Sequence, residues 1–302
     1  GMTAMFKTDG PVRSIEVFCM LFEALIYINL ISMIIYPNGM MRMVREVNGQ
    51  ETWDILPRSF ARTESTRVAW LLGHQGLLTI YAIPGTCSQV LHDYTVKKKN
   101  GFSLRTLAFI AACMIEVFVF SRSANCVLTY GIFLFLLFFY IHNGAWTRKS
   151  NFRQRKKLLS PFWIFIILCI VFVAVVYGNA INVFSFLIVT ILRRDITLTG
   201  RMLVWQKSFE AILKKPILGW GQTTAETGFW LFQIAGHPHN QFLYTAWQGG
   251  LIALVLLVVF IFYSVKPLSR MGISKYTLVI WTATVTIMLG MFGDRYIPFY
   301  NI

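Results

Sequence analysis

The chain has 302 residues, of which 56% are hydrophobic and only 14% are charged. Soluble domains carry about 25% charged residues, so this composition excludes an ordinary soluble protein. Aromatic residues make up 16% of the chain, and such residues are common at lipid-facing and interfacial positions. The composition therefore predicts an all-α fold, a polytopic bundle of transmembrane helices.

The net charge of +15 does not indicate a nucleic-acid partner. The basic residues lie in short segments between apolar runs, such as Lys97-Lys98-Lys99 and the segment from Arg153 to Lys157. No surrounding domain is present to bring bases to these segments. Cytoplasmic loops of membrane proteins are enriched in Lys and Arg, so we predict no nucleic-acid binding and assign the charge to membrane topology.

The cysteines and the first residues add little to this picture. The five cysteines are Cys19, Cys87, Cys113, Cys126 and Cys169. All lie within apolar runs without paired spacing, as expected of small buried hydrophobic residues. Their spacing matches no disulfide or zinc pattern. The start, Gly1-Met2-Thr3, lacks the features of a signal peptide. The first apolar run is therefore expected to remain as a spanning helix.

Seven segments approach the length of about 20 apolar residues that a spanning helix needs. They are Ile15–Tyr36, Val68–Val90, Leu104–Phe120, Ala124–Ile141, Pro161–Tyr177, Phe242–Val265 and Tyr276–Gly293. The short join Ser121-Arg122-Ser123 predicts that the third and fourth spans form a tight hairpin. We expect one membrane domain over residues 1–302, with about seven spans.

The distribution of Lys and Arg between these spans predicts the orientation. The short basic segments fall on one side, and the positive-inside bias assigns that side to the cytoplasm. The longer loops 37–67 and 192–243 carry both signs of charge. They are expected to face outward, together with Arg122 and Asp294-Arg295. The first loop also has room for a short interfacial helix around Trp53.

The outer loop 192–243 contains a segment with helical periodicity. Thr199 is expected to cap this helix, and Pro216 to end it. Its apolar stripe comprises Met202, Trp205, Phe209, Ile212 and Leu213. Such a helix would lie in the headgroup region with the stripe toward lipid, or would pack the stripe on the membrane domain.

Two arginines suit a phosphate ligand on the outer side. The guanidinium group of Arg201, at the start of this helix, makes planar bidentate hydrogen bonds to phosphate and keeps its charge. Arg122 lies close to hydrocarbon, where ionisable groups are costly and usually point into a polar cavity; snorkelling to the interface is the alternative. Together the two side chains could bind a lipid diphosphate.

His237 and His239 flank a single proline. An extended segment would place both imidazoles on one face. An uncoordinated histidine suits proton abstraction from a hydroxyl at neutral pH. The alternatives are a two-histidine metal site, which has no carboxylate or third histidine nearby in sequence, and a structural histidine. Asn240 could orient an imidazole or cap the next helix.

The loop resembles the signature of the O-antigen ligase and O-antigen polymerase superfamily. Members share Gly-Arg followed by Trp, a Pro-x-x-Gly-x-Gly turn, and His-Asn before an apolar span with paired glycines. Here these motifs are Gly200-Arg201, Trp205, Pro216 to Gly221, His239-Asn240 and Gly249-Gly250-Leu251, and Ser121-Arg122 is similar to the family's Ser-Arg. The segment from Trp70 to Gln75, with Tyr36 to Gly39 upstream, resembles the capsule-polymerase branch.

The resemblance implies a membrane glycosyltransferase that polymerises lipid-linked oligosaccharide repeat units. The donor would be a glycan on undecaprenyl diphosphate, and no metal or nucleotide cofactor would be needed. By this resemblance His239 would act as general base, while Arg201 and Arg122 would stabilise the departing diphosphate. The residues expected to contact substrate are His237, Asn240, Trp205, Gly219 and Gly221.

The resemblance also implies a setting. It places the protein in a bacterial inner membrane, with the loop facing the periplasm or the exterior, beside membrane lipid. Flippase and chain-length regulator proteins are its implied partners. Proteins of this kind have several more spans before the region that matches Ile15, so the chain is expected to be truncated at its N-terminus.

Three other functions remain open. A ligase would use the same chemistry with a lipid A core or a protein as acceptor. A transporter could use the ionisable residues within or beside the spans, Glu16, Glu23, His74 and Glu116. A noncatalytic assembly subunit is the third. The polar groups gather in an outer loop rather than at a membrane midplane, which favours the enzyme.

Overall fold

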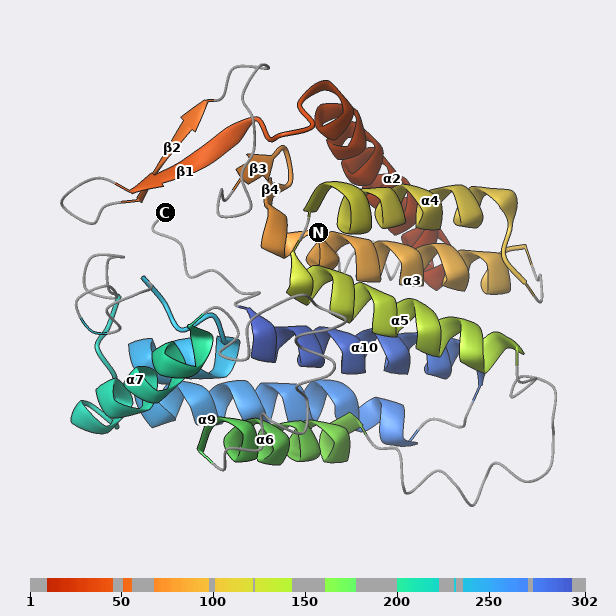
Figure 1. The fold of residues 1–302 in the computed structure, drawn as a ribbon. Coiled ribbons are helices and arrows are strands. Elements are labelled where there is room, and N and C mark those ends of the chain that lie inside the picture. Colours follow the sequence, from red (N-terminus) through yellow and green to blue (C-terminus); the bar gives the residue numbers. More distant parts are fainter. Residues whose placement is uncertain are drawn as a thin grey trace. The chain divides into compact units, whose positions relative to one another are not determined.

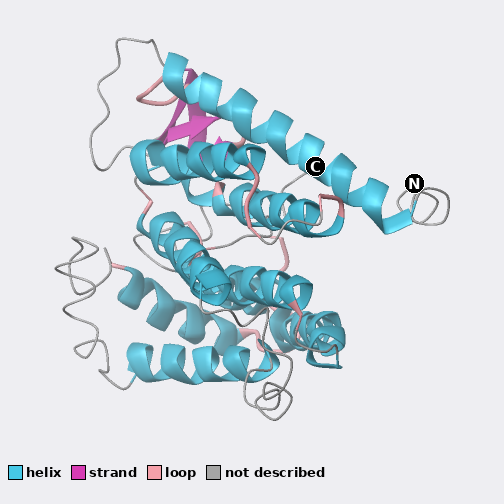
Figure 2. Ribbon diagram, turned by 90° about the vertical axis from the view of Figure 1, so that its right-hand side faces the viewer, coloured by secondary structure: helices cyan, strands magenta, loops and turns pink. Residues whose placement is uncertain are grey.

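The computed structural model describes residues 10–45, 51–55, 68–97, 101–121, 123–142, 161–177, 200–222, 231, 236–270 and 274–294. Over these residues the protein is predominantly helical (Figures 1 and 2), which confirms the predicted all-α class. The chain divides into two compact units. The first unit comprises residues 1–43, 53–155 and 271–287, and the second comprises residues 44–52, 156–270 and 288–302.

Helices form most of the first unit. They are α2 (Gly10–Ile35), α3 (Thr79–Thr95), α4 (Leu104–Met114), α5 (Ala124–His142) and the larger part of α10 (Lys275–Gly293). Helix α3 packs against α2, α4 and α5 (Figure 1). Helix α4 continues into a π-helical segment, η2 (Ile115–Ser121), and α5 begins three residues after its end. The short join between the third and fourth predicted spans is therefore present; α5 contacts η2, the continuation of α4, whereas α3 packs against both α4 and α5.

A small sheet precedes α3 in the chain. Its strands are β1 (Met41–Arg45), β2 (Glu51–Ile55), β3 (Val68–Trp70) and β4 (Gly73–His74), in the order β2-β1-β3-β4. Strand β3 pairs antiparallel with β1 and with β4. A 3-10 turn, η1 (Gln75–Leu77), connects β4 to α3.

This sheet corrects two predictions. The expected span Val68–Val90 is wrong at its start, because its first residues form β3 and β4, and α3 begins only at Thr79. All three residues of β3 are buried within the protein, so their apolar character reflects a protein core and not lipid contact. The expected interfacial helix around Trp53 is also wrong, since Trp53 lies in β2.

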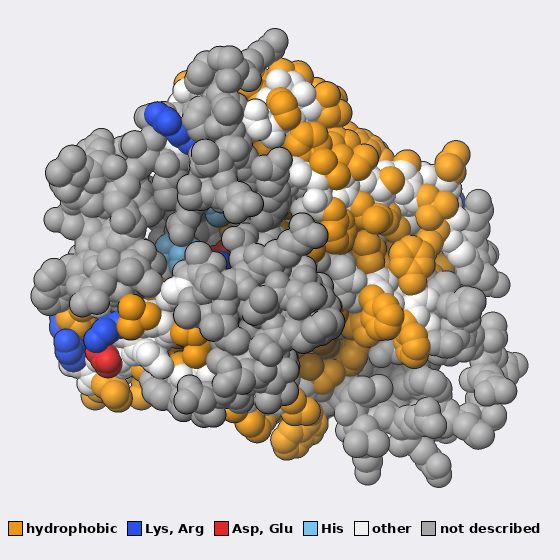
Figure 3. All heavy atoms as spheres, viewed as in Figure 1, with side chains coloured by type: hydrophobic (Ala, Val, Ile, Leu, Met, Phe, Trp, Pro, Cys, Tyr) orange, Lys and Arg blue, Asp and Glu red, His pale blue; other side chains and the backbone are white. Residues whose placement is uncertain are grey.

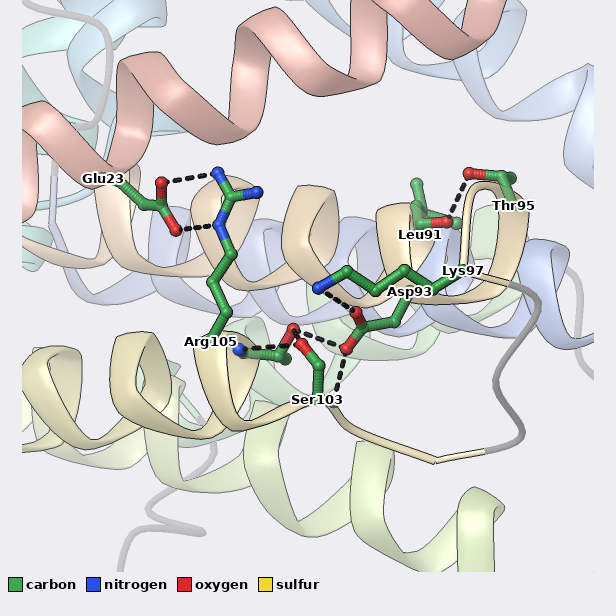
Figure 4. Close-up of polar contacts among 8 residues, drawn as sticks. Glu23, Leu91, Asp93, Thr95, Lys97, Ser103 and Arg105 are labelled. Atoms are coloured by element: carbon green, nitrogen blue, oxygen red, sulfur yellow. Dashed lines mark hydrogen bonds and ion pairs between the residues drawn. The ribbon is translucent and has the colours of Figure 1, made fainter.

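Charged residues of the first unit are paired where helices meet. Arg105, near the start of α4, donates from Nε and Nη2 to the Glu23 carboxylate of α2, at 2.5 and 2.6 Å (Figure 4). Asp93 of α3 accepts hydrogen bonds from the Ser103 backbone N–H and the Thr106 hydroxyl, both at 2.6 Å. These contacts tie the start of α4 to α2 and α3.

A second polar contact lies within the same unit. Glu116 of η2 is fully buried and accepts a hydrogen bond from Asn29 of α2 at 3.1 Å. Asn29 in turn accepts the Leu72 backbone N–H at 3.0 Å. Since Glu23 and Glu116 both connect secondary-structure elements, their positions in the helix bundle do not by themselves indicate an ion path.

The second unit contains α6 (Pro161–Tyr177), α7 (Arg201–Lys214), α9 (Gln241–Arg270) and the end of α10. Helices α6 and α7 both pack on α9. The helix α9 is interrupted at Gly250, whose φ of 65° and ψ of −167° are not helical. The chain therefore contains a helix, a kink and a second helix within residues 241–270.

The aromatic contacts of α9 show how sharp this kink is. Phe262 packs on Phe162 of α6, with ring centroids 4.9 Å apart, while Phe242 packs on Phe165 of α6 at 5.3 Å. In a straight helix, 20 residues extend about 30 Å, so Phe242 and Phe262 could not reach neighbouring positions of α6. The first half of α9 therefore folds back around Gly250 toward the second half.

Four described helices are long and apolar enough to cross a membrane. They are Val12–Ile35, Leu104–Ser121, Gln241–Leu268 and Lys275–Gly293, and they correspond to the first, third, sixth and seventh predicted spans. The predicted sixth span, Phe242–Val265, is wrong at its start, because the kink at Gly250 interrupts it. The segments Ala124–Phe139 and Pro161–Val176 are shorter apolar helices. Exposed large apolar side chains are frequent on these helices, and the orange surface in Figure 3 shows such side chains on one face. This exposure suits contact with lipid, while the total of seven spans stays a prediction.

Candidate active site

The loop 192–243, predicted to face outward, contains α7, which begins at Arg201. Gly200 precedes it with a φ of 80° and occupies the N-cap position. Glycine adopts this left-handed conformation without strain, which explains the Gly-Arg pair. The predicted cap at Thr199 is therefore wrong, and Thr199 itself lies outside the described residues. The helix ends at Lys214, shortly before Pro216, as predicted.

The apolar face of α7 packs inside the second unit. Its buried residues are Val204, Trp205, Ser208, Ala211 and Ile212, and they contact α6 and α9. The predicted position of this stripe on lipid is therefore wrong, and the packing alternative is confirmed. Leu213, which the sequence placed in the stripe, is instead 76% exposed.

Trp205 connects α7 to the histidine segment. Its indole Nε1–H donates to the Pro238 carbonyl at 2.9 Å, and its ring packs on Phe172 of α6 with centroids 4.9 Å apart. The Trp205 side chain is nearly completely buried. A single side chain of α7 therefore fixes the peptide between the two histidines.

His237 and His239 lie side by side, with ring centroids 4.0 Å apart. The His239 backbone N–H donates to Nδ1 of His237 at 3.2 Å. His239 has a φ of 50°, the left-handed region that non-glycine residues rarely adopt. The two rings are therefore adjacent as predicted, but a tight turn brings them together and the extended segment is wrong.

Asn240 forms the cap of the helix that follows. Its side-chain oxygen accepts the backbone N–H groups of Phe242 and Leu243, at 2.9 and 3.0 Å. Its amide nitrogen donates to the Phe292 carbonyl near the end of α10, at 3.1 Å. Asn240 thus caps α9, one of its two predicted roles, and it also anchors the histidine turn to α10.

Arg201 reaches the same end of α10. Its Nη1 donates a hydrogen bond to the carbonyl of Gly293, the last residue of that helix. A guanidinium group has five N–H donors, so this contact uses only part of its capacity. The start of α7 and the start of α9 therefore meet at the end of α10.

Asp294, immediately after α10, is the site residue that the sequence did not identify. Its Oδ1 lies 3.6 Å from Nδ1 of His239, within the range of an ion pair. Both side chains are largely buried, at 12% and 13% exposure. The sequence signal was an acidic residue directly after the last apolar span, on the same predicted side as the outer loop.

The charge state of Asp294 follows from its surroundings. Burial by itself raises the pKa of a carboxyl group, because removal from water disfavours the charged form. The His239 imidazole beside it, and then the charges of Arg201 and His237, outweigh burial and lower the pKa of Asp294 well below its usual value. A carboxylate beside Nδ1 of His239 favours the tautomer that carries its proton on Nδ1.

Comparison with known families identifies the chain. The sequence profile described as O-antigen ligase matches residues 107–258, half of the 302 residues. The chain belongs to the O-antigen ligase family. The matched region of the family contains Arg201, Trp205 and both histidines, but it ends before Asp294. Neither a search of curated proteins nor a search of solved structures finds a match.

Membership of the O-antigen ligase family agrees with the apolar helices of this chain. It makes the protein an integral membrane protein and a glycosyl-transferring enzyme that acts on lipid-linked glycans. The predicted membership of the ligase and polymerase superfamily is confirmed.

The Pro-x-x-Gly-x-Gly turn of this family member lies against the kink of α9. The Trp220 N–H donates to the Trp247 carbonyl at 2.9 Å, and the Gly221 N–H donates to the Gln248 carbonyl at 2.8 Å. In return, the Leu251 N–H donates to the Pro216 carbonyl at 2.7 Å. The turn therefore supplies hydrogen-bond partners to backbone groups of α9 that lose their helical partners at the kink.

Two glycines allow this close approach. Gly219 has a φ of 69°, and a Cβ there would lie 2.5 Å from the Gln248 carbonyl oxygen. A Cβ on Gly250 would collide with the carbonyl of Ile217. The histidines precede the first half of α9, whereas these glycines lie where that half ends. Nine helical residues separate the two positions, which corresponds to about 13 Å.

The structure thus separates the predicted site residues into groups. Those that it brings together at the end of α10 are Arg201, His237, His239 and Asn240, with Trp205 joined through Pro238. Gly219 and Gly221 lie at the kink instead. Arg122 is outside the described residues. Among the residues described, no group of three or more His, Cys, Asp or Glu is arranged to bind a metal.

Proposed function

We propose that this protein polymerises lipid-linked oligosaccharide repeat units, with a glycan on undecaprenyl diphosphate as donor. The observation that carries the proposal is the cluster of His239, Asp294 and Arg201 at the end of α10. It combines an imidazole, a carboxylate beside that imidazole, and a guanidinium group. These groups suit a transfer in which a hydroxyl loses a proton and a diphosphate departs.

In the proposed step His239 is the general base. With its proton on Nδ1 facing Asp294, the other ring nitrogen, Nε2, has the lone pair that accepts a proton. The acceptor hydroxyl gives its proton to Nε2 while its oxygen bonds to the anomeric carbon of the donor. The bond from that carbon to the diphosphate breaks, and the diphosphate-lipid leaves with the electron pair. Asp294 stabilises the imidazolium that forms.

Arg201 has the complementary role on the leaving group. Charge grows on the diphosphate oxygens as the glycosidic bond breaks, and a fixed guanidinium stabilises this charge. Its hydrogen bond to the Gly293 carbonyl orients the group. Arg122 is proposed as the second arginine on the diphosphate. This scheme needs no metal, because the diphosphate already activates the anomeric carbon.

The remaining predicted residues receive more specific roles. His237 lies against His239 and is proposed to contact substrate. Asn240 and Trp205 are buried and bonded to backbone groups, so we assign them to positioning the histidine turn. Gly219 and Gly221 shape the kink of α9.

The proposed setting follows the family resemblance. The protein would act in a bacterial inner membrane, with the loop facing the periplasm or exterior. A flippase would supply its substrate, and a chain-length regulator would limit its product.

The test is a reaction of the purified protein in lipid nanodiscs with lipid-linked repeat units and no added metal or nucleotide. A polymerase yields a ladder with steps of one repeat unit, together with free undecaprenyl diphosphate. His239→Ala should reduce both products by about 10²–10⁴-fold, as expected for a lost general base, while protein level and membrane insertion stay unchanged. A ladder from His239→Ala would refute the proposed base.

The alternative is a ligase, which the description of the matching family names. It would show the same dependence on His239 but would require a lipid A core or a protein acceptor. Adding such an acceptor to the same assay separates the two: a ligase forms one new conjugate only when the acceptor is present. Movement of intact substrate across sealed vesicles without new bonds would instead indicate a transporter.

A further inference from the structure

The end of α7 and the turn after it form an exposed apolar tip, residues Leu213 to Leu218. Three large apolar side chains of the tip are exposed by 65–76%: Leu213, Ile217 and Leu218. Soluble surfaces rarely gather such side chains. The tip is not part of a predicted span, so its exposure is not explained by the transmembrane helices alone.

Cationic and aromatic groups lie on the same tip. Lys214 and Lys215 are both exposed. The Lys215 ammonium lies 4.3 Å from the ring centre of Trp220, whose Nε1–H donates to the Ala211 carbonyl. Lysine and tryptophan beside exposed aliphatic side chains are typical of the interface between hydrocarbon and headgroups.

The tip is bonded to the point where the lipid-facing part of α9 begins. The Leu251 and Ile252 N–H groups donate to the carbonyls of Pro216 and Ile217. Before this point, residues 241–247 of α9 are buried within the protein. After it, exposed apolar side chains recur along the helix: Leu251, Ile252, Val255, Leu256, Val259 and Phe260.

The length of this second half agrees with a membrane crossing. From Leu251 to Leu268 it extends about 27 Å at 1.5 Å per residue, close to the hydrocarbon thickness of about 30 Å. At the other end, the Lys266 ammonium lies over the rings of Phe262 and Tyr263, at 5.6 and 5.2 Å. The hydrocarbon boundary therefore falls near the kink at Gly250.

We propose that the tip Leu213–Leu218 inserts into the headgroup layer of an anionic phospholipid leaflet. Leu213, Ile217 and Leu218 would contact acyl chains, while Lys214 and Lys215 would contact lipid phosphates. The tip extends the lipid-facing surface of α9 onto the outer loop. It thereby fixes the depth of α7, and with it Arg201, against the membrane surface. This inference does not depend on the proposed reaction.

The test places the environment-sensitive fluorophore NBD on single cysteines in the complete protein, in nanodiscs of phosphatidylcholine with phosphatidylglycerol. Ile217→Cys and Leu218→Cys report on the tip. Glu210→Cys, on an exposed part of the same helix, is the matched control. The unmodified chain gives the background of its native cysteines, of which Cys87 and Cys169 are half-buried.

Labels on the tip should emit at shorter wavelength than the label at Glu210. Lipids with a doxyl group near the headgroup should quench them at least about two-fold more strongly, as expected for insertion of about 5–10 Å. Iodide in water should quench the Glu210 label instead. Lys214→Glu combined with Lys215→Glu should reduce the lipid quenching in anionic nanodiscs and leave it unchanged in phosphatidylcholine alone.

Two results would overturn the proposal. Quenching of the tip labels by iodide, as at Glu210, would place the tip in water. Protection from both iodide and doxyl lipid would show that protein, such as a second copy of this chain, covers the tip.

Discussion

Nδ1 of His239 lies 3.6 Å from Oδ1 of Asp294, although 55 residues separate the two in the chain. One residue precedes the cap of α9 and the other follows the last residue of α10. The hydrogen bond of Asn240 to Phe292 fixes these two helix ends to each other, and that of Arg201 to Gly293 adds the start of α7. The proposed base and its carboxylate thus belong to one junction, which side-chain hydrogen bonds to backbone carbonyls hold together.

Asp294→Asn tests the role of this carboxylate. The amide can still accept a hydrogen bond from the imidazole but has no charge to stabilise the imidazolium. We expect the transfer rate to fall by roughly 10-fold or more, to a value between the wild type and His239→Ala. Rates from initial formation of undecaprenyl diphosphate give the comparison. A wild-type rate would remove Asp294 from the mechanism.

The acid dependence of stability gives an independent test of Asp294. Its folded-state pKa is lowered below the usual value of 3.8. Such a group stabilises the folded state above the carboxyl pKa of the unfolded chain, and this stabilisation is lost as pH falls toward the folded-state pKa. The Tm deficit of Asp294→Asn should therefore persist from pH 7 to about pH 4 and shrink below it. A deficit that vanishes between pH 7 and pH 5 would contradict the lowered pKa.

Arg201→Lys should impair transfer although it keeps the positive charge. A lysine cannot donate to the Gly293 carbonyl and to a diphosphate with the fixed planar geometry of a guanidinium. We expect a loss of about 10-fold or more in kcat. The matched control is the reverse exchange on the same helix, Lys207→Arg, whose ammonium pairs with Glu210 at an exposed position. Equal activity of both variants would reduce Arg201 to a packing residue.

Trp205→Phe should slow transfer without unfolding the protein. Phenylalanine retains packing on Phe172 but leaves the Pro238 carbonyl without its indole donor, so the histidine turn can shift. A displacement of about 1 Å costs roughly 100-fold in rate. Trp220→Phe is the control, because it removes an equivalent indole bond, to Ala211, away from the histidines. Similar rate losses in both variants would indicate a general packing effect.

Gly219→Ala and Gly221→Ala separate two costs at the turn. Both glycines have positive φ values, 69° and 74°, so each alanine costs about 1–2 kcal/mol of backbone strain. Only the Cβ at Gly219 collides with the Gln248 carbonyl, whereas nothing lies within 4 Å of one at Gly221. Gly219→Ala should therefore lower the free energy of unfolding by about 1–3 kcal/mol more than Gly221→Ala does. Denaturant titration in mixed micelles measures the difference, and equal losses would disprove the close approach.

Local patterns in the sequence were enough for several parts of this protein. Apolar runs of sufficient length determined the helices that became α2, α4, α9 and α10, because a membrane helix satisfies all its backbone groups internally. Pro216 marked the end of α7, since proline cannot continue a helix, whereas the predicted cap at Thr199 was one residue too early. The order of the motifs also identified the family.

Tertiary structure alone decided the rest. The run Val68–Trp70 is apolar because protein buries it in a strand, and apolar character does not distinguish a protein core from lipid. The stripe of α7 faces α6 and α9 for the same reason. Gly249-Gly250 permits a kink, but its direction depends on the contacts of Phe242 and Phe262 with α6. Asp294 reaches His239 only because two helix ends meet, a proximity set by long-range packing that no local pattern of residues encodes.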